Sequence, residues 1–391
     1  MHAGPPRPSD SARSIDAPFG VDFVHRLRFT RGLFDPANPI LREVLDLDPS
    51  SPRRTVVFVD AGVAAAWPGL SDAIQAYAAA HPTSIRLVAP PETVAGGEAA
   101  KNSRAVVDRV LEVVHERAIC RRSYVLAVGG GAMLDAVGFA AATAHRGVRL
   151  IRVPTTTLAQ DDAAVGVKNG INRFGKKNFV GTFSPPWAVL NDEAFLETLS
   201  DRDFRAGLSE TVKVALVRDA AYFDEIEALA PRLAARDMVA TMPVIRRSAE
   251  LHLRHIVGGG DPFELDEARP LDFGHWSAHK LEQMTGFAVP HGEAVGMGLA
   301  LDCLYSVRTG RLAEADFQRV RRCMVAMDLP LAHAAMKDKK ALLAGLEEFR
   351  EHLGGRLTIT LLRGIGEPED VHEVDEQLMS RCVDEMLDLG G

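Results

Sequence analysis

Three histidines in the second half of the chain have the types and spacing to bind a metal ion. His275 and His279 are four residues apart, which places both on one face of a helix, and His291 follows twelve residues later. Two imidazoles and a carboxylate, with coordination positions left open, suit a catalytic Zn²⁺ that polarises a substrate oxygen. The alternative is a histidine pair that arose by chance on a surface helix. The sequence contains no HExxH motif, which argues against a metalloprotease.

A glycine-rich turn in the first half of the chain can hold an anion. Gly129, Gly130 and Gly131 follow a predicted buried strand and precede a predicted helix. Glycines let the backbone approach a ligand closely, and a helix N-terminus favours a group such as pyrophosphate. The spacing differs from GxGxxG and the turn follows the third strand, so a tight turn that holds no ligand is the alternative. Asp60, at the end of the first predicted strand, is either a ribose ligand or only a loop acid.

The elements that must position these groups alternate in the manner of an α/β protein. Short β-branched apolar runs predict strands, and apolar residues three and four apart predict helices between them. The predicted strands span 54–60, 84–89, 123–128 and 148–153, and the predicted helices span 70–80, 98–116 and 135–143. This alternation predicts a parallel sheet with both faces covered by helices.

The apolar pattern becomes almost wholly helical from about residue 201, apart from a predicted strand at 356–362. We therefore expect a flexible tail over residues 1–20, a nucleotide-binding α/β domain over 21–200 and a mainly helical domain over 201–391. A cleft between the two domains is the expected place for a ligand.

Composition excludes several protein classes. The 391 residues are 47% hydrophobic and 25% charged, which excludes a disordered, collagen-like or coiled-coil chain. The 45 Lys and Arg residues against 53 Asp and Glu residues give a net charge of −8, so neither nucleic acid nor a membrane is an expected partner. The first twenty residues contain no signal-peptide apolar region, and the four cysteines are scattered. A cytoplasmic protein with reduced cysteines is the expectation.

One segment between the glycine turn and the histidines carries a family resemblance. It reads VPTTTLAQDDAAVGVKNGIN over 153–172 and GKKNFVGTFSPP over 175–186. It closely resembles the 3-dehydroquinate synthases of the sugar phosphate cyclase superfamily, whose pattern reads PTTLLAxxDSSVGGKTxIN…GKNxIGxFxxP. Further motifs of that family follow the same order at 97–101, 207–213, 273–275, 291–297 and 337–340.

The resemblance implies a Rossmann-like NAD-binding domain followed by a mainly helical metal-binding domain. The residues that it assigns to NAD contacts are Asp60, Glu98, Lys101, Gly130, Gly131, Asp135, Thr155, Thr156, Asp162, Lys177, Phe195, Thr198 and Leu199. It assigns the metal, normally zinc and alternatively Co²⁺, to Glu210, His275 and His291.

The resemblance also implies substrate contacts. It matches His279 to a histidine that lines the substrate pocket, and it assigns phosphate and polyol contacts to Lys168, Asn178, Lys213 and one of Lys339 and Lys340. Lys213 stands one helical turn from Glu210, which argues against a merely solvated lysine. Arg146 matches an arginine that reaches the neighbouring subunit's site, so the resemblance implies a homodimer.

The sequence departs from the family beside the first zinc histidine. The family has an Arg seven residues before this histidine and an Asn three before it, both near the substrate carboxylate, and here these positions are Ala268 and Asp272. The family lysine twenty-one residues before it is Arg254 here. A one-residue shift of register would let Arg269 supply the missing charge. Otherwise Asp272 repels a carboxylate and accepts hydrogen bonds from a neutral group.

The sequence therefore predicts an NAD- and metal-dependent carbon–oxygen lyase. Its expected substrate is a heptulose 7-phosphate similar to sedoheptulose 7-phosphate, which is converted to a carbocycle with loss of phosphate. The alternatives are a true 3-dehydroquinate synthase of the shikimate pathway, a polyol or glycerol-phosphate dehydrogenase of the iron-containing alcohol dehydrogenase group, and a paralogue that binds a ligand without turnover.

Overall fold

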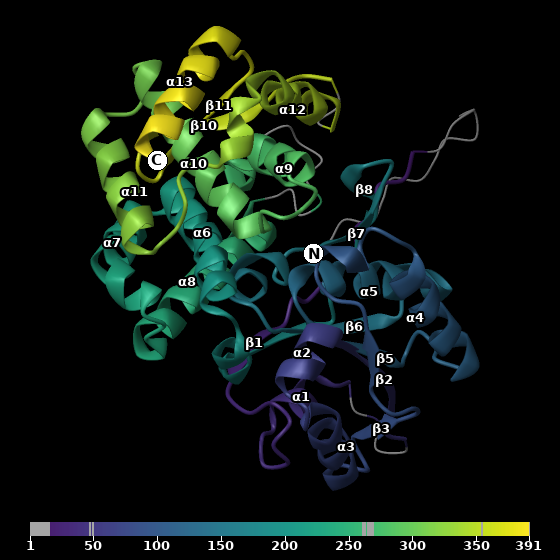
Figure 1. Cartoon of the computed structure of the whole chain (residues 1–391). Helices are drawn as coiled ribbons and strands as arrows, with labels where there is room; N and C mark the ends of the chain where they lie inside the picture. The colour runs from purple at the N-terminus through teal and green to yellow at the C-terminus, as the bar shows by residue number, and fades with distance from the viewer. Residues whose placement is uncertain are drawn as a thin grey trace, which may run out of the picture.

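The computed structural model describes residues 16–46, 48, 51–259, 263, 270–352 and 355–390. Most of the expected tail (residues 1–15) lies outside the described residues, and so do Ala268 and Arg269. The described chain forms an α/β half and a helical half that lie side by side (Figure 1). This confirms the predicted fold class.

A seven-stranded parallel sheet forms the centre of the α/β half. Its order is β1-β9-β6-β5-β2-β3, with β4 paired to β2 beyond the end of β3. The strands are β1 (Leu27–Thr30), β2 (Arg53–Asp60), β3 (Ile85–Leu87), β4 (Glu92–Val94), β5 (Tyr124–Gly129), β6 (Arg149–Pro154) and β9 (Ala188–Asp192). The sheet places the ends of β2, β5 and β6 next to one another, so Asp60, the glycine turn and Thr155 lie at one edge.

Helices cover both faces of this sheet, as the alternating apolar residues require. Val56 and Phe58 pack on one face, whereas Val57 and Val59 pack on the other. The helices of this half are α1 (Ile40–Val44), α2 (Ala61–Ala66), α3 (Leu70–Ala80), α4 (Ala105–Glu116) and α5 (Gly131–Thr143).

Two predicted helices begin elsewhere than the periodicity indicates. The helix expected from residue 98 is a single 3-10 turn, η1 (Glu98–Ala100), and α4 begins only at Ala105. Gly97 precedes the turn with a φ of +60°, a backbone conformation that breaks regular structure. The helix expected from residue 135 starts already at Gly131, so the third glycine of the turn is the first residue of α5.

The second half is a helical domain around its own apolar core. Its helices are α6 (Asp201–Arg218), α7 (Ala220–Ala234), α8 (Met238–Gly258), α9 (His275–Met284), α10 (His291–Arg308), α11 (Glu314–Ala326), α12 (Lys339–His352) and α13 (Glu376–Leu389). The predicted strand near 356–362 is β10 (Ile359–Gly364), and it pairs antiparallel with β11 (Glu367–Val371). Among the described helices none is both long and apolar enough to cross a membrane.

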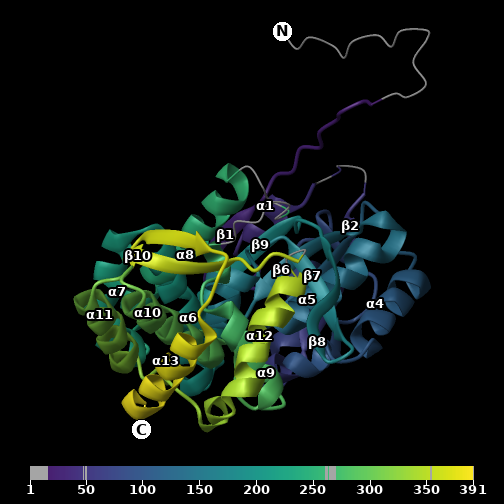
Figure 2. The same cartoon turned by 90° about the horizontal axis from the view of Figure 1, so that it is seen from above.

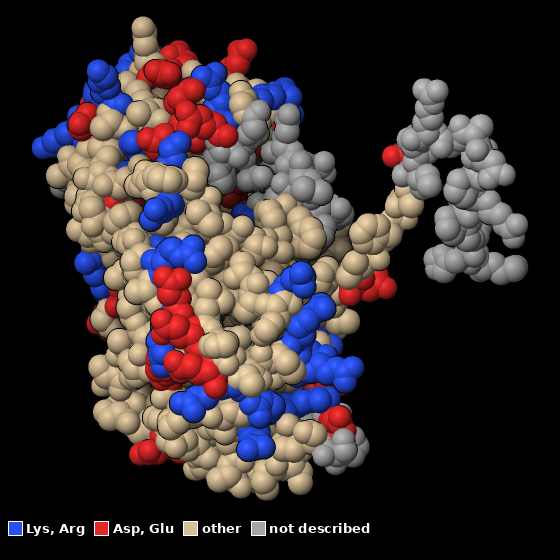
Figure 3. Space-filling view, turned by 90° about the vertical axis from the view of Figure 1, so that its right-hand side faces the viewer, with Lys and Arg blue, Asp and Glu red and all other residues tan. Residues whose placement is uncertain are grey.

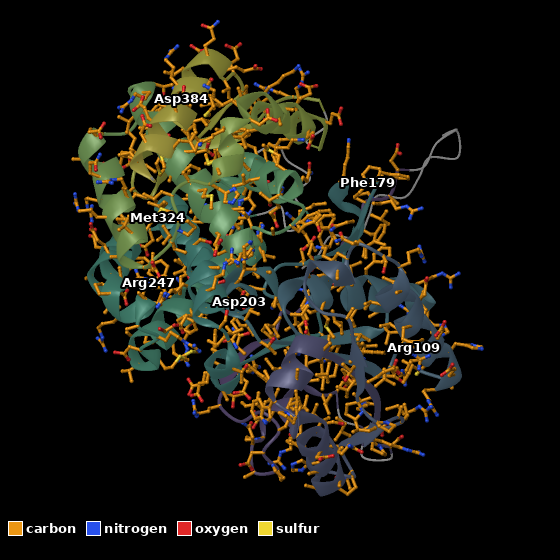
Figure 4. The ribbon with its side chains drawn as sticks, viewed as in Figure 1. Arg109, Phe179, Asp203, Arg247, Met324 and Asp384 are labelled. Atoms are coloured by element: carbon orange, nitrogen blue, oxygen red, sulfur yellow. The ribbon has the colours of Figure 1, made fainter. Side chains whose placement is uncertain are left out.

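The two halves meet closely at the start of α6. Thr157 Oγ1 donates to the carbonyl oxygen of Phe204 at 2.8 Å and approaches that of Asp203 at 3.3 Å. Figure 4 labels Asp203 at this junction. A Cβ on Gly207 would lie 2.0 Å from Thr157 Oγ1, so only glycine allows α6 to pack this closely.

An antiparallel hairpin extends from the α/β half to the helical half. It consists of β7 (Lys168–Arg173) and β8 (Lys176–Phe183), and it lies beside α9 and α12 in both views (Figures 1 and 2). Lys176 Nζ lies 2.8 Å from Glu351 on α12, and Lys177 Nζ lies 2.7 Å from Glu282 on α9. The hairpin therefore connects the two halves by ion pairs.

Candidate metal and nucleotide site

Three helices bring a carboxylate and two imidazoles together, as predicted. Glu210 Oε1 on α6 lies 3.5 Å from His275 Nε2 on α9 and 3.3 Å from His291 Nε2 on α10. His275 is the first residue of α9 and His291 the first of α10, so both rings project from helix starts. Glu210 is fully buried.

The donor set fits a divalent metal ion. His275 Nδ1 donates to the carbonyl oxygen of Phe273 at 3.0 Å, and His291 Nδ1 lies 3.0 Å from Glu282 Oε2. Each bond leaves Nε2 free to bind a metal. Both Glu210 oxygens are buried without an aligned hydrogen-bond partner among the described residues. A buried carboxylate in this state is stabilised by a nearby cation, here the Lys213 ammonium at 2.6 Å and, when bound, a metal ion.

His279, which the resemblance assigns to the substrate pocket, lies beside the two histidines that are expected to bind the metal. One ring nitrogen from each of His275, His279 and His291 can be chosen so that all three lie within 4.8 Å of one another. Its ring stacks on that of His291 with centroids 5.8 Å apart. Burial and the neighbouring His275 hold the pKa of His279 well below its ordinary value, so the ring is neutral. A neutral ring at this position can bind a metal or a substrate hydroxyl.

Glu282 is a site residue that the sequence analysis missed. It is almost fully buried on α9, where its carboxylate contacts both Lys177 and His291. Burial opposes its ionisation, but the His291 ring and the Lys177 ammonium hold its pKa well below the ordinary value. Burial likewise opposes protonation of His291, yet Glu282 raises the pKa of His291 to about 9. Glu282 therefore orients His291 and increases its basicity.

This raised pKa predicts that zinc uptake by the metal-free protein releases a proton. Below about pH 9 the metal must displace the proton on His291, so the apparent zinc affinity should rise roughly tenfold per pH unit between pH 7 and pH 9. Calorimetric titration in two buffers of different ionisation enthalpy measures the released proton. Glu282→Gln lowers the pKa of His291 and should reduce the proton release at pH 7.5, and an unchanged release would contradict this account.

Lys213 joins the metal residues to a second acidic group. Its Nζ lies 2.6 Å from Glu210 Oε2 and 3.5 Å from Asp162 Oδ2, and the side chain is buried. Burial opposes its charge, but Asp162, Glu210 and, more weakly, Asp272 raise the pKa of Lys213 above its ordinary value. The lysine is therefore charged, and the half-buried Asp272 lies within its electrostatic range.

Asp162 is carried by a short π-helix, η3 (Ala159–Ala163), that follows β6. Burial raises its pKa, but the Lys213 ammonium outweighs burial and lowers the pKa to about 2. Asp161 beside it is fully buried, and burial raises its pKa well above the ordinary value. Thr211 Oγ1 donates to Asp161 Oδ2 at 2.6 Å. The pKa values of the two neighbouring acids are thus shifted in opposite directions.

A buried arginine fixes the loop after η3. Arg152 on β6 donates to the carbonyl oxygens of Ala164, Gly166 and Lys168 at 2.7–2.9 Å, and to Asn169 Oδ1 at 2.7 Å. Its side chain is fully buried. The backbone carbonyls therefore balance much of the cost of burying its charge.

The glycine turn opens α5 as expected. Gly130 is the N-cap of α5 and no side chain caps this end. The first N–H groups of the helix can therefore donate hydrogen bonds to an anion. Thr155 Oγ1, at the end of the neighbouring strand, is buried and has no hydrogen-bond partner among the described residues. Thr156 Oγ1 accepts from the amide of Ala159 instead.

Several residues expected to contact NAD form a connected polar group beside this turn. Lys101 Nζ lies 2.6 Å from Asp135 Oδ2 and also donates to Asn178 Oδ1, which comes from the hairpin. Glu98 Oε1 accepts from Asn172, and Lys177 Nζ lies 3.9 Å from Glu98 Oε2. Because Lys177 also contacts Glu282, this group and the metal residues are continuous.

The remaining residues of the expected NAD set lie at the same edge of the sheet or just beyond it. Asp60 is buried and caps α2 by accepting from the amide of Gly62 at 2.8 Å. A Cβ on Gly96 would lie 2.1 Å from Asp60, so the next loop passes directly over this acid. Phe195 is fully buried against Trp67, Thr198 Oγ1 donates to the carbonyl of Phe195, and Leu199 packs on the helical core.

Four expected substrate residues lie apart from this assembly, namely Arg146, Arg254, Lys339 and Lys340. Arg146 is exposed beyond the C-terminal end of α5, and Arg254 is exposed on α8 with Glu250 at 4.0 Å. Lys339 pairs with Asp384 at 2.9 Å, and it lines with Lys340 a cavity of about 830 Å³ between α12 and α13. None of the metal residues lines that cavity. Lys168 is exposed at the start of β7.

The surface agrees with the charge balance of the sequence. Figure 3 shows basic and acidic side chains on the same face, with large uncharged areas between them. The buried charges of Lys101, Lys177 and Lys213 instead lie inside the molecule, next to carboxylates. Three lysines with largely buried side chains therefore lie at the site, each paired with a carboxylate.

Two protein-family models match most of the chain. The model described as 3-dehydroquinate synthase N-terminal matches residues 92–206, and the one described as 3-dehydroquinate synthase C-terminal matches residues 207–348. A 3-dehydroquinate synthase of Cereibacter sphaeroides (strain KD131) is 40% identical over 285 residues, which are 71% of this chain and 76% of that protein. One of Ruegeria pomeroyi is 35% identical over 341 residues, 86% of this chain and 90% of that protein.

A solved structure is similar over nearly the whole chain. It is a 2-epi-5-epi-valiolone synthase from Streptomyces hygroscopicus subsp. jinggangensis, with NAD⁺ and Zn²⁺ bound. The TM-score is 0.86 at 29% sequence identity, and the match covers 96% of this chain and 100% of that one.

Proposed function

The chain belongs to the 3-dehydroquinate synthase family of sugar phosphate cyclases, and on this basis we propose that it converts a ketose 7-phosphate into a carbocycle by eliminating phosphate. Such an enzyme is a carbon–oxygen lyase. The observation that supports the choice of substrate is Asp272, which lies within electrostatic range of the charged Lys213 at a position where the family pattern has an asparagine.

NAD⁺ and a divalent metal, Zn²⁺ or alternatively Co²⁺, are the cofactors of this proposal. NAD⁺ would lie over the glycine turn, and Glu210, His275 and His291 would hold the metal. When bound, these groups supply reversible hydride removal and polarisation of a substrate oxygen. The solved 2-epi-5-epi-valiolone synthase, which holds NAD⁺ and Zn²⁺, supports the pairing.

The chain's own residues supply binding and charge stabilisation. Lys213, buried and charged, is the proposed donor to the leaving phosphate, because a charge-assisted bond is strongest where water is excluded. Asn178 and Lys168 at the two ends of the hairpin are the proposed phosphate and polyol contacts. His279 is the proposed contact to a substrate hydroxyl. Arg254, Lys339 and Lys340 lie apart from these groups, and the proposal assigns them no contact in this conformation.

Arg146 is proposed to act at the site of a second copy of the chain. It follows a helix of 13 residues whose other end is the glycine turn, a separation of about 20 Å. Arg146 therefore lies far from the glycine turn of its own chain, where NAD⁺ would lie. We therefore propose a homodimer in which Arg146 serves the neighbouring site.

The substrate choice predicts a rate difference. A carboxylate about 4 Å from Asp272 is repelled by roughly 1–4 kcal/mol, so sedoheptulose 7-phosphate should exceed 3-deoxy-arabino-heptulosonate 7-phosphate in kcat/KM by tenfold or more. Phosphate release with NAD⁺ and Zn²⁺ measures both. Asp272→Asn removes the repulsion and should reduce the difference in kcat/KM between the two substrates.

The opposite result identifies the competing function. A tenfold preference for the heptulosonate, with 3-dehydroquinate as product, would make this chain a shikimate-pathway enzyme, the activity that its curated relatives are named for. A net change in NADH absorbance during turnover would instead indicate a polyol dehydrogenase, because a cyclase regenerates its cofactor.

A further inference from the structure

Helix α8 presents a histidine to the site, although the sequence pattern places the substrate-binding residue of this helix two positions later. His252 is 9% exposed, whereas the side chain of Arg254 is 76% exposed. Two residues on a helix are separated by about 200° around its axis, so the two side chains leave α8 on opposite sides. Since α8 packs against η3, the side that carries His252 faces Asp162.

His252 is the end of a continuous series of charged contacts. Its Nδ1 lies 2.7 Å from Asp162 Oδ1, and the other oxygen of Asp162 lies 3.5 Å from Lys213 Nζ. Lys213 Nζ in turn lies 2.6 Å from Glu210, which faces the two metal-binding histidines. Five elements therefore meet through these side chains: α8, η3, α6 and the starts of α9 and α10.

The distances show what the contact with His252 does. Asp162 is closer to His252 than to Lys213 by 0.8 Å, although Lys213 carries a full positive charge. A free carboxylate beside a buried ammonium closes to about 2.8 Å, because a charge-assisted bond is strongest at that separation. Two contacts account for the longer distance: Lys213 Nζ is already 2.6 Å from Glu210 Oε2, and His252 Nδ1 approaches the other oxygen of Asp162 at 2.7 Å, although without the alignment of a hydrogen bond.

We propose that His252 is a positioning residue that fixes Asp162 between the NAD⁺ site and Lys213. Asp162 is one of the residues expected to contact NAD⁺, so its orientation affects cofactor binding as well as the lysine. Without His252, Asp162 turns toward Lys213 and forms an ion pair with its ammonium. The ammonium is then no longer available to donate to the leaving phosphate. This inference rests on the proposed function for its effect on turnover, but its effect on NAD⁺ binding is independent of the substrate.

The test compares four variants of the full chain loaded with zinc, the fourth of which, Arg254→Ala, is used in the turnover measurement. His252→Ala removes the contact, and His252→Asn restores a nitrogen close to the place of Nδ1. His255→Ala is the matched control, because it removes the same residue type one turn along α8, where the ring contacts Arg218 instead of the site. Zinc content and melting temperature are recorded for all variants, so that a folding defect is distinguished from a loss of positioning.

Calorimetric titration with NAD⁺ is the first measurement and needs no turnover. His252→Ala should weaken NAD⁺ binding about tenfold, His252→Asn should lie within about threefold of the unmodified chain, and His255→Ala should match it. Equal NAD⁺ affinity in His252→Ala and the unmodified chain overturns the proposal. Equal weakening in His252→Asn and His252→Ala also overturns it, because the restored nitrogen would then have no effect.

Phosphate release from sedoheptulose 7-phosphate is the second measurement. His252→Ala should lower kcat by about 10- to 100-fold while KM for the sugar phosphate changes less than threefold. If the rate of phosphate release falls in Arg254→Ala but not in His252→Ala, Arg254 and not His252 is the functional residue of α8, and the inference is overturned. An unmodified chain that binds NAD⁺ but releases no phosphate contradicts the proposed function, while the NAD⁺ titrations still decide the role of His252.

Discussion

Replacing His291 with alanine should remove the bound zinc and lower turnover by about a thousandfold or more. His291 supplies one of the two Nε2 atoms that face Glu210, and no other described histidine in the cluster is oriented by a buried carboxylate. The α/β half should keep its structure, because His291 lies at the start of α10, outside the sheet and its helices. Metal analysis, phosphate release and circular dichroism measure the three quantities.

His81→Ala is the control for this variant. His81 ends α3 on the surface of the α/β half, where its ring contacts the carbonyl of Pro36, so neither zinc nor activity should change. Stoichiometric zinc in His291→Ala would show that His275, His279 and Glu210 suffice as ligands. The assignment of His291 would then be wrong, and His279 would take its place.

Lys213→Ala should lower the rate by roughly two to three orders of magnitude while NAD⁺ affinity stays unchanged. Lys213 is the buried cation beside both the metal residues and Asp162, so its loss removes the proposed donor to the leaving phosphate. Removing one partner of a buried ion pair also destabilises the fold, by about 3–5 kcal/mol when the remaining charge is left uncompensated. Zinc on Glu210 reduces this cost, and the assay is therefore made on zinc-loaded protein.

Lys213→Arg separates charge from position. It keeps the positive charge and the fold but places a planar, bulkier group in the pocket, so we expect an intermediate rate. Lys337→Ala removes an exposed lysine from η6 (Ala334–Lys337) and should leave the rate unchanged. If Lys213→Ala turns over like the unmodified chain, the lysine serves only to balance Glu210 and Asp162.

Buried apolar runs made the central sheet predictable, whereas the β7–β8 hairpin was not predicted. β2, β5 and β6 are largely apolar and buried, and both ends of each strand lie within one residue of the expected bounds. The β7–β8 hairpin was missed because β8 is largely exposed and contains two lysines and an asparagine. Its position depends on ion pairs to α9 and α12, which no local pattern shows.

The site was predictable where one helix carries the chemistry. His275, His279 and Glu282 lie at positions i, i+4 and i+7 of α9, so helical spacing alone places the missed Glu282 on the face of the two histidines. His252 offered no such signal. Which side of α8 faces the site is decided by its packing against η3, and the sequence around Arg254 is equally compatible with either side.

Arg152 bears on how this substrate pocket can change in evolution. Three of its four bonds go to carbonyl oxygens, which every amino acid provides, so the path of the loop over 164–168 is specified without specifying its side chains. Packing still constrains the buried Ala164, Val165 and Val167, whereas Gly166 and the exposed Lys168 can be exchanged while the backbone keeps its course. A library that randomises Gly166 and Lys168 with Arg152 retained should yield folded enzymes with altered substrate preference, and the same library built on Arg152→Met should not.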